Sequence, residues 1–183
     1  MNKEKTKVIW IGRKKFSKDK LEVNCNLEWG STVFDLLGLK FSVNLKEMLD
    51  LNFDRAISQI ENIFRHWNKR YLTPMGKITV IKTFAISKII HLLATLPNPS
   101  EIVVKKINQL MFKFLWDNKP EKISRKQITQ SYTQGGLNMI NLEYFIESLK
   151  ISWIRRLLKT SDSSWVNLFE STISTNKMQM QKY

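Results

Sequence analysis

The sequence predicts a mostly helical α+β fold, in which a short antiparallel β segment precedes an antiparallel helical bundle and a further basic helix. Short runs of apolar and β-branched residues, punctuated by glycine, occupy residues 6–41. From residue 46 onward, apolar residues recur at three- and four-residue spacing in several segments joined by short breaks. The first pattern is typical of strands, and the second is typical of packed amphipathic helices.

The composition indicates a folded and strongly basic protein. The chain has 183 residues, 43% of them hydrophobic, which is enough for one domain or a small pair with a real core. Its 30 lysines and arginines against 16 acids give a net charge of +14, which favours polyanions, with nucleic acid first and anionic membrane second. The lone Cys25 allows no internal disulfide and favours a reducing compartment. We expect neither a membrane span nor a signal peptide.

The β segment is expected to be an incomplete sheet. Its candidate strands are Thr6 to Ile11, Leu21 to Cys25 and Phe34 to Phe41. A sheet of three short strands is marginal unless a helix or a further strand covers it.

The first helix is predicted over residues 46–71. Its apolar stripe consists of Phe53, Ile57, Ile60, Phe64, Trp67 and Tyr71. The opposite side carries Arg55, Ser58, Asn62, Arg65 and Lys69. This polar side is either a solvated face or a face that binds nucleic acid.

The second helix is predicted from Pro74 to about Leu96, with Thr73 as its N-cap. The N–H groups of Met75, Gly76 and Lys77 at its start, together with the helix dipole, predict a phosphate seat. The alternative is an ordinary tight corner between two helices. Lys77 and Lys88 are eleven residues apart, so a regular helix places them on one line, while Lys82 points elsewhere.

Two more helices follow. One begins at Ser100 and ends near Trp116, and short connections make it an antiparallel neighbour of the first two. Gly135 and Gly136 form a turn, after which Asn141 caps a basic helix that carries Lys150, Arg155, Arg156 and Lys159. Residues 164–169 are predicted to form a helical turn, and a polar tail follows it.

No catalytic constellation is visible in the sequence. There is no adjacent Asp-Asp pair, no phosphate-binding Gly-x-x-x-x-Gly-Lys loop and no Gly-x-Ser-x-Gly elbow. His66 and His91 are 25 residues apart and are interpreted as surface or packing residues rather than metal ligands.

Three motifs, taken in order, resemble the reverse transcriptase of LINE-type (non-LTR) retrotransposons, downstream of its catalytic palm motif. The first is Trp67 followed by Gly76-Lys77-Ile78, Ile81 and Lys82. The second is Lys113-Phe-Leu-Trp116 with Lys119, Lys122 and Ile123, and the third is Gly135-Gly136-Leu137 with Asn141-Leu142 and Phe145. Residues 5–12 and Leu37-Gly38 also resemble the closing strands of the palm. The similarity extends from about residue 5 to about residue 158, and Ile140 stands where many relatives have proline.

The resemblance implies a layout and a set of partners. Residues 1–45 would end the palm sheet, 46–117 would form the helical thumb, 118–160 would begin the linker, and 161–183 would be a polar tail. The partners would be RNA, RNA–DNA duplex and the palm and fingers of the parent polymerase, with no membrane. The parent would use Mg²⁺ held by acids upstream, so no cofactor is expected in this segment and whether it counts as an enzyme stays open. The location would be intracellular, and nuclear for an active element.

The sequence therefore predicts a non-catalytic nucleic-acid-binding segment that grips the template–primer duplex through phosphates. The expected contacts, in order, are Arg70, Lys77 and Lys88, then Lys82, Arg55, Arg65 and Lys69, with Gly76 at the helix start. The alternative is a basic helical protein-interaction module with no nucleic-acid role. An anionic-membrane binder is a weaker third reading, because no helix combines strong amphipathicity with aromatic residues beside a basic face.

Overall fold

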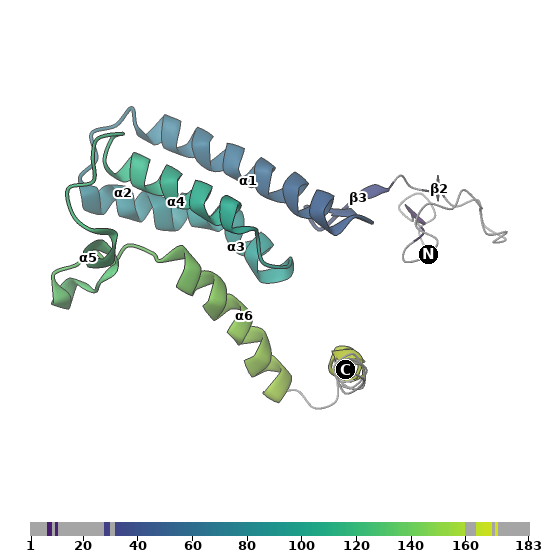
Figure 1. Cartoon of the computed structure of the whole chain (residues 1–183). Coiled ribbons are helices and arrows are strands. Elements are labelled where there is room, and N and C mark those ends of the chain that lie inside the picture. Colours follow the sequence, from purple (N-terminus) through teal and green to yellow (C-terminus); the bar gives the residue numbers. More distant parts are fainter. Residues whose placement is uncertain are drawn as a thin grey trace. The chain divides into compact units, whose positions relative to one another are not determined.

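The computed structural model describes residues 7–8, 10, 28–29, 32–159, 164–169 and 171. The chain forms two compact units, Met1–Ile140 and Asn141–Tyr183, each described by itself below. The first contains a two-stranded antiparallel sheet followed by helices, which confirms the mostly helical α+β fold (Figure 1). The finer division into four parts at residues 45, 117 and 160 stays a prediction.

The strand predicted over residues 34–41 is in fact a hairpin. Strand β3 (Val33–Leu36) pairs antiparallel with β4 (Leu39–Ser42), and Phe34 stacks on its partner Phe41 with ring centroids 5.5 Å apart. Leu37 and Gly38 both have positive φ, 52° and 80°, as the two central residues of a tight hairpin turn require. The single-strand prediction was wrong because Leu37 gives no sequence signal of that backbone.

A second strand pair lies nearer the N-terminus. Strand β1 (Lys7–Val8), inside the first predicted strand, pairs parallel with β2 (Glu28–Trp29). The candidate strand Leu21 to Cys25 lies outside the described residues.

One buried asparagine fixes the β3–β4 hairpin to helix α1 (Leu45–Trp67). Asn52 accepts a hydrogen bond from Lys40 N (2.9 Å) and donates to Lys40 O and Met48 O (2.7 Å each). Its side chain is 4% exposed, and the neighbouring Leu39 is buried. The side-chain amide of Asn52 thus uses both its oxygen and its nitrogen in hydrogen bonds. These bonds hold β4 at a defined place on α1.

The second predicted helix is continuous but not regular. It consists of α2 (Pro74–Val80), a π-helical turn η3 (Ile81–Ala85) and α3 (Ile86–Thr95). The three- and four-residue spacing of Ile78, Ile81, Ala85, Ile89 and Leu92 predicts one apolar stripe, and all five residues are buried. By length and composition alone Pro74–Thr95 could cross a bilayer, but a core helix of a soluble protein passes the same test.

Helix α4 (Glu101–Leu115) completes the bundle, with Ser100 as its N-cap. Helix α1 contacts α3, η3 and α4, while α2 contacts α4, so these helices lie side by side (Figure 1). In the core, Phe64 of α1 stacks on Phe114 of α4 with centroids 4.4 Å apart. The predicted stripe of the first helix is buried from Phe53 to Phe64, but the prediction was wrong at its end, because α1 stops at Trp67 and Tyr71 is fully exposed.

The segment after α4 is compact and turns on two glycines. It contains α5 (Arg125–Thr129) and a 3-10 turn η4 (Tyr132–Gln134). Gly135 has φ 73°, while a Cβ on Gly136 would lie 2.2 Å from Gln130 O. The predicted Gly-Gly turn therefore has two different causes: one residue needs the left-handed conformation, and the other needs space for the backbone.

The second unit contains helix α6 (Leu142–Lys159). Asn141 caps it as predicted, since its side-chain oxygen accepts from Tyr144 N at 3.2 Å. Residues 164–169 are helical, as predicted, and Trp165 packs edge-on against Trp153.

Candidate nucleic-acid interface

Two of the predicted contact residues meet in a pocket of about 150 Å³, here called the hairpin pocket. It lies where the β3–β4 turn, α1 and α3 come together. Its lining consists of Gly38 and Leu39 from the hairpin, Asn52, Arg55, Ala56 and Gln59 from α1, and Lys88, His91 and Leu92 from α3. The sequence predicted Arg55 and Lys88 separately, and the fold brings them to one place.

The side chains of the hairpin pocket suit an anion. Arg55 offers a planar fork of N–H donors and Lys88 an ammonium, and neither forms an ion pair with another described residue. No carboxylate of the described residues lines the pocket. A phosphate oxygen placed there would meet two full positive charges, with His91 and Gln59 as further hydrogen-bonding groups.

Sequence reasoning did not single out His91 or Gln59. His91 follows Lys88 by three residues, and Gln59 follows Arg55 by four, so each shares a helix face with the neighbouring cation. That spacing could have indicated which residues share a helix face. It could not show that the Arg55 face of α1 meets the Lys88 face of α3, because this depends on how the two helices pack.

Lys77 occupies a different environment from the one expected. It is 4% exposed, and its Nζ lies 2.5 Å from Asp117 Oδ1 at the end of α4. The ammonium also lies 5.8 Å from the centroid of the Phe114 ring. This lysine holds two elements together, so its charge is engaged inside the protein rather than presented at the surface.

The π-helical turn explains why Lys77 and Lys88 do not lie on one line. A π-turn bonds each residue to the fifth one along instead of the fourth, which shifts the register of all that follows. Lys77 precedes η3 and is buried, while Lys88 follows it and is exposed. The prediction assumed a regular helix and was wrong on this point.

The start of α2 is a capped corner. Thr73 Oγ1 accepts from Gly76 N at 3.2 Å, and Thr73 O accepts from Lys77 N at 2.9 Å. Two of the three N–H groups assigned to the phosphate seat are therefore bonded within the chain. The alternative reading, a tight helix–helix corner, describes this geometry better.

The remaining predicted residues do not line the hairpin pocket. Arg70 is exposed and lies over the Trp67 ring, 4.5 Å from its centroid. Arg65 and Lys69 are exposed at the end of α1, and Lys82 is half-buried in the π-turn. They add positive charge around the bundle without converging on one point.

A second basic pocket, here called the α4–α5 pocket, lies at the C-terminal end of α4 and measures about 510 Å³. Its lining includes Lys113, Lys119 and Arg125, together with Phe112 and Glu121. Arg125 donates through Nε to both Glu121 oxygens at 3.0 Å, and its guanidinium lies 4.3 Å from the Phe112 ring centroid. The hydrogen bond from Arg125 lowers the pKa of Glu121 and raises the pKa of Arg125, against the opposing effect of partial burial. Sequence reasoning missed this pocket.

Acidic residues gather at a third place on the surface. Glu47, Asp50 and Asp54 line a separate hollow near the start of α1. Among the described residues, no group of three or more His, Cys, Asp or Glu side chains is arranged to hold a metal ion. No protein-family model matches the chain.

Proposed function

We propose that this protein binds duplex nucleic acid, RNA–DNA hybrid above all, by holding backbone phosphate in the hairpin pocket. The observation that carries the proposal is the convergence of Arg55 and Lys88, from two helices, in one hollow without a carboxylate. Phosphate contacts of this kind position a duplex without reading its sequence. The net charge of +14 adds long-range attraction for the same ligand.

Cations outside the pocket extend this interaction. Arg65 lies in the last turn of α1, Lys69 and Arg70 follow that helix, and the half-buried Lys82 lies in η3. Arg55 and Arg65 of α1 are 10 residues apart, which is about 15 Å along the helix, or roughly four nucleotides of one strand. A duplex lying along α1 can therefore meet several cations at once.

In this proposal the chain acts as the thumb and early linker of a LINE-type reverse transcriptase, the family that its ordered motifs resemble. The Mg²⁺-binding acids of the parent palm would carry out the polymerase chemistry, and this chain would hold the template–primer duplex. For a chain in an active element, the site of action is the nucleus. Lys77 takes no direct part, since its ammonium is paired with Asp117.

The experiment compares two neutralising substitutions of equal charge. Lys88→Gln is set against Lys105→Gln, because Lys105 is exposed on α4 and pairs with the also exposed Glu101. Binding of the full chain to a blunt RNA–DNA hybrid is measured by fluorescence anisotropy. Lys88→Gln should weaken binding by roughly five- to tenfold, from the typical worth of a charge-assisted contact, and Lys105→Gln by less than about twofold.

Equal and small losses from both substitutions would contradict the proposal. They would favour the basic protein-interaction module, in which positive charge acts diffusely. A clear preference for one duplex sequence over another would also count against phosphate-only recognition.

A further inference from the structure

We propose that the α4–α5 pocket binds one unpaired nucleotide of a nucleic acid, with its base stacked on the Arg125 guanidinium and its phosphate near Lys113 and Lys119. This extends the proposed affinity for nucleic acid and rests on it, but it assigns a different ligand to a different site. The hairpin pocket holds backbone phosphate, whereas the α4–α5 pocket accepts a base that has left its duplex.

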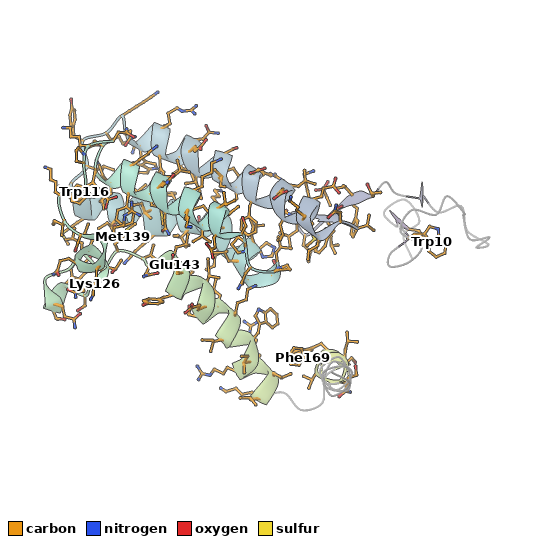
Figure 2. All side chains as sticks on the ribbon, in the orientation of Figure 1. Trp10, Trp116, Lys126, Met139, Glu143 and Phe169 are labelled. Atoms are coloured by element: carbon orange, nitrogen blue, oxygen red, sulfur yellow. The ribbon has the colours of Figure 1, made fainter. Side chains whose placement is uncertain are left out.

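The flat surface for the base is already assembled. Phe112 is 6% exposed, and the Arg125 guanidinium lies 4.3 Å from the centroid of its ring. Glu121 holds the same guanidinium from its edge, with Nη2 2.5 Å from Oε1 in addition to the Nε bonds. Arg125 nevertheless keeps 49% of its side chain exposed and lines the pocket. Unpaired bases stack on such guanidinium planes, which every base can do through its π-face (Figure 2 shows the side chains of this end of the bundle).

The charges of the α4–α5 pocket suit the phosphate attached to that base. Lys113 and Lys119 line it and form no ion pair with another described residue. Its one carboxylate, Glu121, is already paired with Arg125. Gln109 and Asn118 add side-chain amides, which can both donate to and accept from a base edge.

The volume also favours a single nucleotide. The pocket measures about 510 Å³, within the range of roughly 300–1,000 Å³ that small-molecule sites occupy. In a duplex each base is stacked on both faces, so only a base outside the stack can lie flat on Arg125. The concave shape therefore selects single-stranded ends, bulges or overhangs.

A sharp turn after α4 shapes one side of the α4–α5 pocket. Asp117 and Asn118 both have positive φ, 52° and 58°, and turn the chain sharply after α4. Asn118 N donates to Lys113 O at 2.8 Å, and Lys119 N donates to Trp116 O at 2.9 Å. The turn places Asn118 and Lys119 opposite Gln109 and Phe112 before any ligand arrives, which lowers the ordering cost of binding.

The test uses a short oligouridine RNA and an abasic strand of the same length and phosphate number. The full chain should bind the oligouridine more tightly by roughly five- to 150-fold, the usual effect of stacking one base on a planar side chain. Arg125→Lys keeps the charge but removes the plane, so it should bring the ratio of the two dissociation constants close to one. Arg156→Lys is the matched control, because Arg156 also lies over an aromatic ring, that of Trp153, outside the pocket.

A second variant separates loss of the plane from local unfolding. Glu121→Gln weakens the ion pair and leaves the guanidinium in place, so the preference for the strand with bases should persist. Loss of the preference in both Arg125→Lys and Glu121→Gln would overturn the proposal, as would equal binding of the two strands by the unsubstituted chain. Binding to the blunt hybrid, which depends on Lys88, should be unchanged in Arg125→Lys. A chain that binds the hybrid through Lys88 but ignores bases would therefore retain the proposed function and lose only this site.

Discussion

Lys77 Nζ lies 2.5 Å from Asp117 Oδ1, and this contact joins the start of α2 to the turn after α4 across 40 residues of sequence. The two partners differ sharply in exposure, since the side chain of Lys77 is 5% exposed and that of Asp117 is 58% exposed. The Lys77 ammonium is therefore largely desolvated, whereas the Asp117 carboxylate remains largely hydrated. The pair is therefore needed mainly to satisfy the buried ammonium.

This asymmetry predicts an unequal response to removing either partner. Asp117→Asn leaves a buried ammonium without its counter-charge and should lower the free energy of unfolding by about 1–3 kcal/mol. Lys77→Met removes the charge, fills a similar volume and leaves Asp117 in water, so it should cost less than about 1 kcal/mol. Urea denaturation at neutral pH measures both. A larger loss from Lys77→Met would mean that the ion pair itself supplies the stability.

Binding to RNA–DNA hybrid should depend strongly on salt. If the basic surface neutralises about four phosphates, log K should fall against log salt with a slope of roughly −3 to −4, using the rule of about −0.9 per phosphate for duplex DNA. Substituting both Arg55 and Lys88 by Gln should reduce the steepness of the slope by about 2. Titrations at several salt concentrations test this, and a slope that stays the same in the double variant would place the phosphate contacts elsewhere.

The attachment of the hairpin can be tested at one position. Asn52→Ala removes three hydrogen bonds and strands the N–H and C=O of Lys40, which should cost about 1–3 kcal/mol. Asn62→Ala is the matched control, because Asn62 is exposed on the same helix and alanine there should be neutral or slightly stabilising. Amide hydrogen exchange of residues 33–42 should accelerate only in the first variant. Unchanged exchange there would show that Leu39 packing alone holds the hairpin.

Two glycines should respond to alanine in opposite directions. In Gly136→Ala the new Cβ would lie 2.2 Å from Gln130 O, a backbone atom, so the chain must shift at a cost of about 1–3 kcal/mol or more. In Gly76→Ala the nearest atom is 3.5 Å away, which is an ordinary contact, and alanine should stabilise the helix start by up to about 1 kcal/mol. Thermal melts of both variants give the comparison. Similar shifts for the two would contradict the close approach at Gly136.

The Glu121–Arg125 pair should make a small contribution to stability that depends on pH. The pKa of Glu121 is lowered below its ordinary value of 4.5, chiefly by the hydrogen bond from Arg125. Its stabilising effect is therefore present above that value and is lost as the pH falls through the lower pKa of the folded state. The stability difference between the unsubstituted chain and Glu121→Gln should be seen at about pH 7 and disappear in acid, once the pH lies well below the lowered pKa of Glu121. A difference of equal size in both conditions would show that the carboxylate charge is not involved.

The sequence carried the helical part of the fold well. The stripes of Phe53, Ile57 and Ile60 in α1, and of Ile78, Ile81 and Ile89 in the next helix, are buried as their spacing indicated. Capping residues also placed helix starts correctly, since Thr73, Ser100 and Asn141 each accept from a backbone N–H of the first turn. These signals are local, so a single sequence is sufficient to recognise them.

The predictions were wrong where the environment of a side chain depends on residues far away in the sequence. The role of Lys77 depends on Asp117, and no local pattern shows that the two meet. Likewise, the sequence predicts Arg55 as a surface cation, but its convergence with Lys88 in one pocket depends on how α1 and α3 pack. The α4–α5 pocket needs the left-handed turn at Asp117 and Asn118, and neither residue is a glycine that would have announced it. Apolar periodicity predicts which residues share one face of a helix, whereas a binding pocket forms only where the faces of several elements pack together.

The π-helical turn at Ile81–Ala85 is equivalent to one residue inserted into an otherwise regular helix. Deleting a single residue there would restore α-helical geometry and rotate one half of the helix by about 100° against the other. Lys77 would then leave Asp117 if α3 kept its packing, or Lys88 would leave the hairpin pocket if α2 kept its own. The inserted residue thus lets a single continuous helix place Lys77 against Asp117 and Lys88 in the hairpin pocket at the same time.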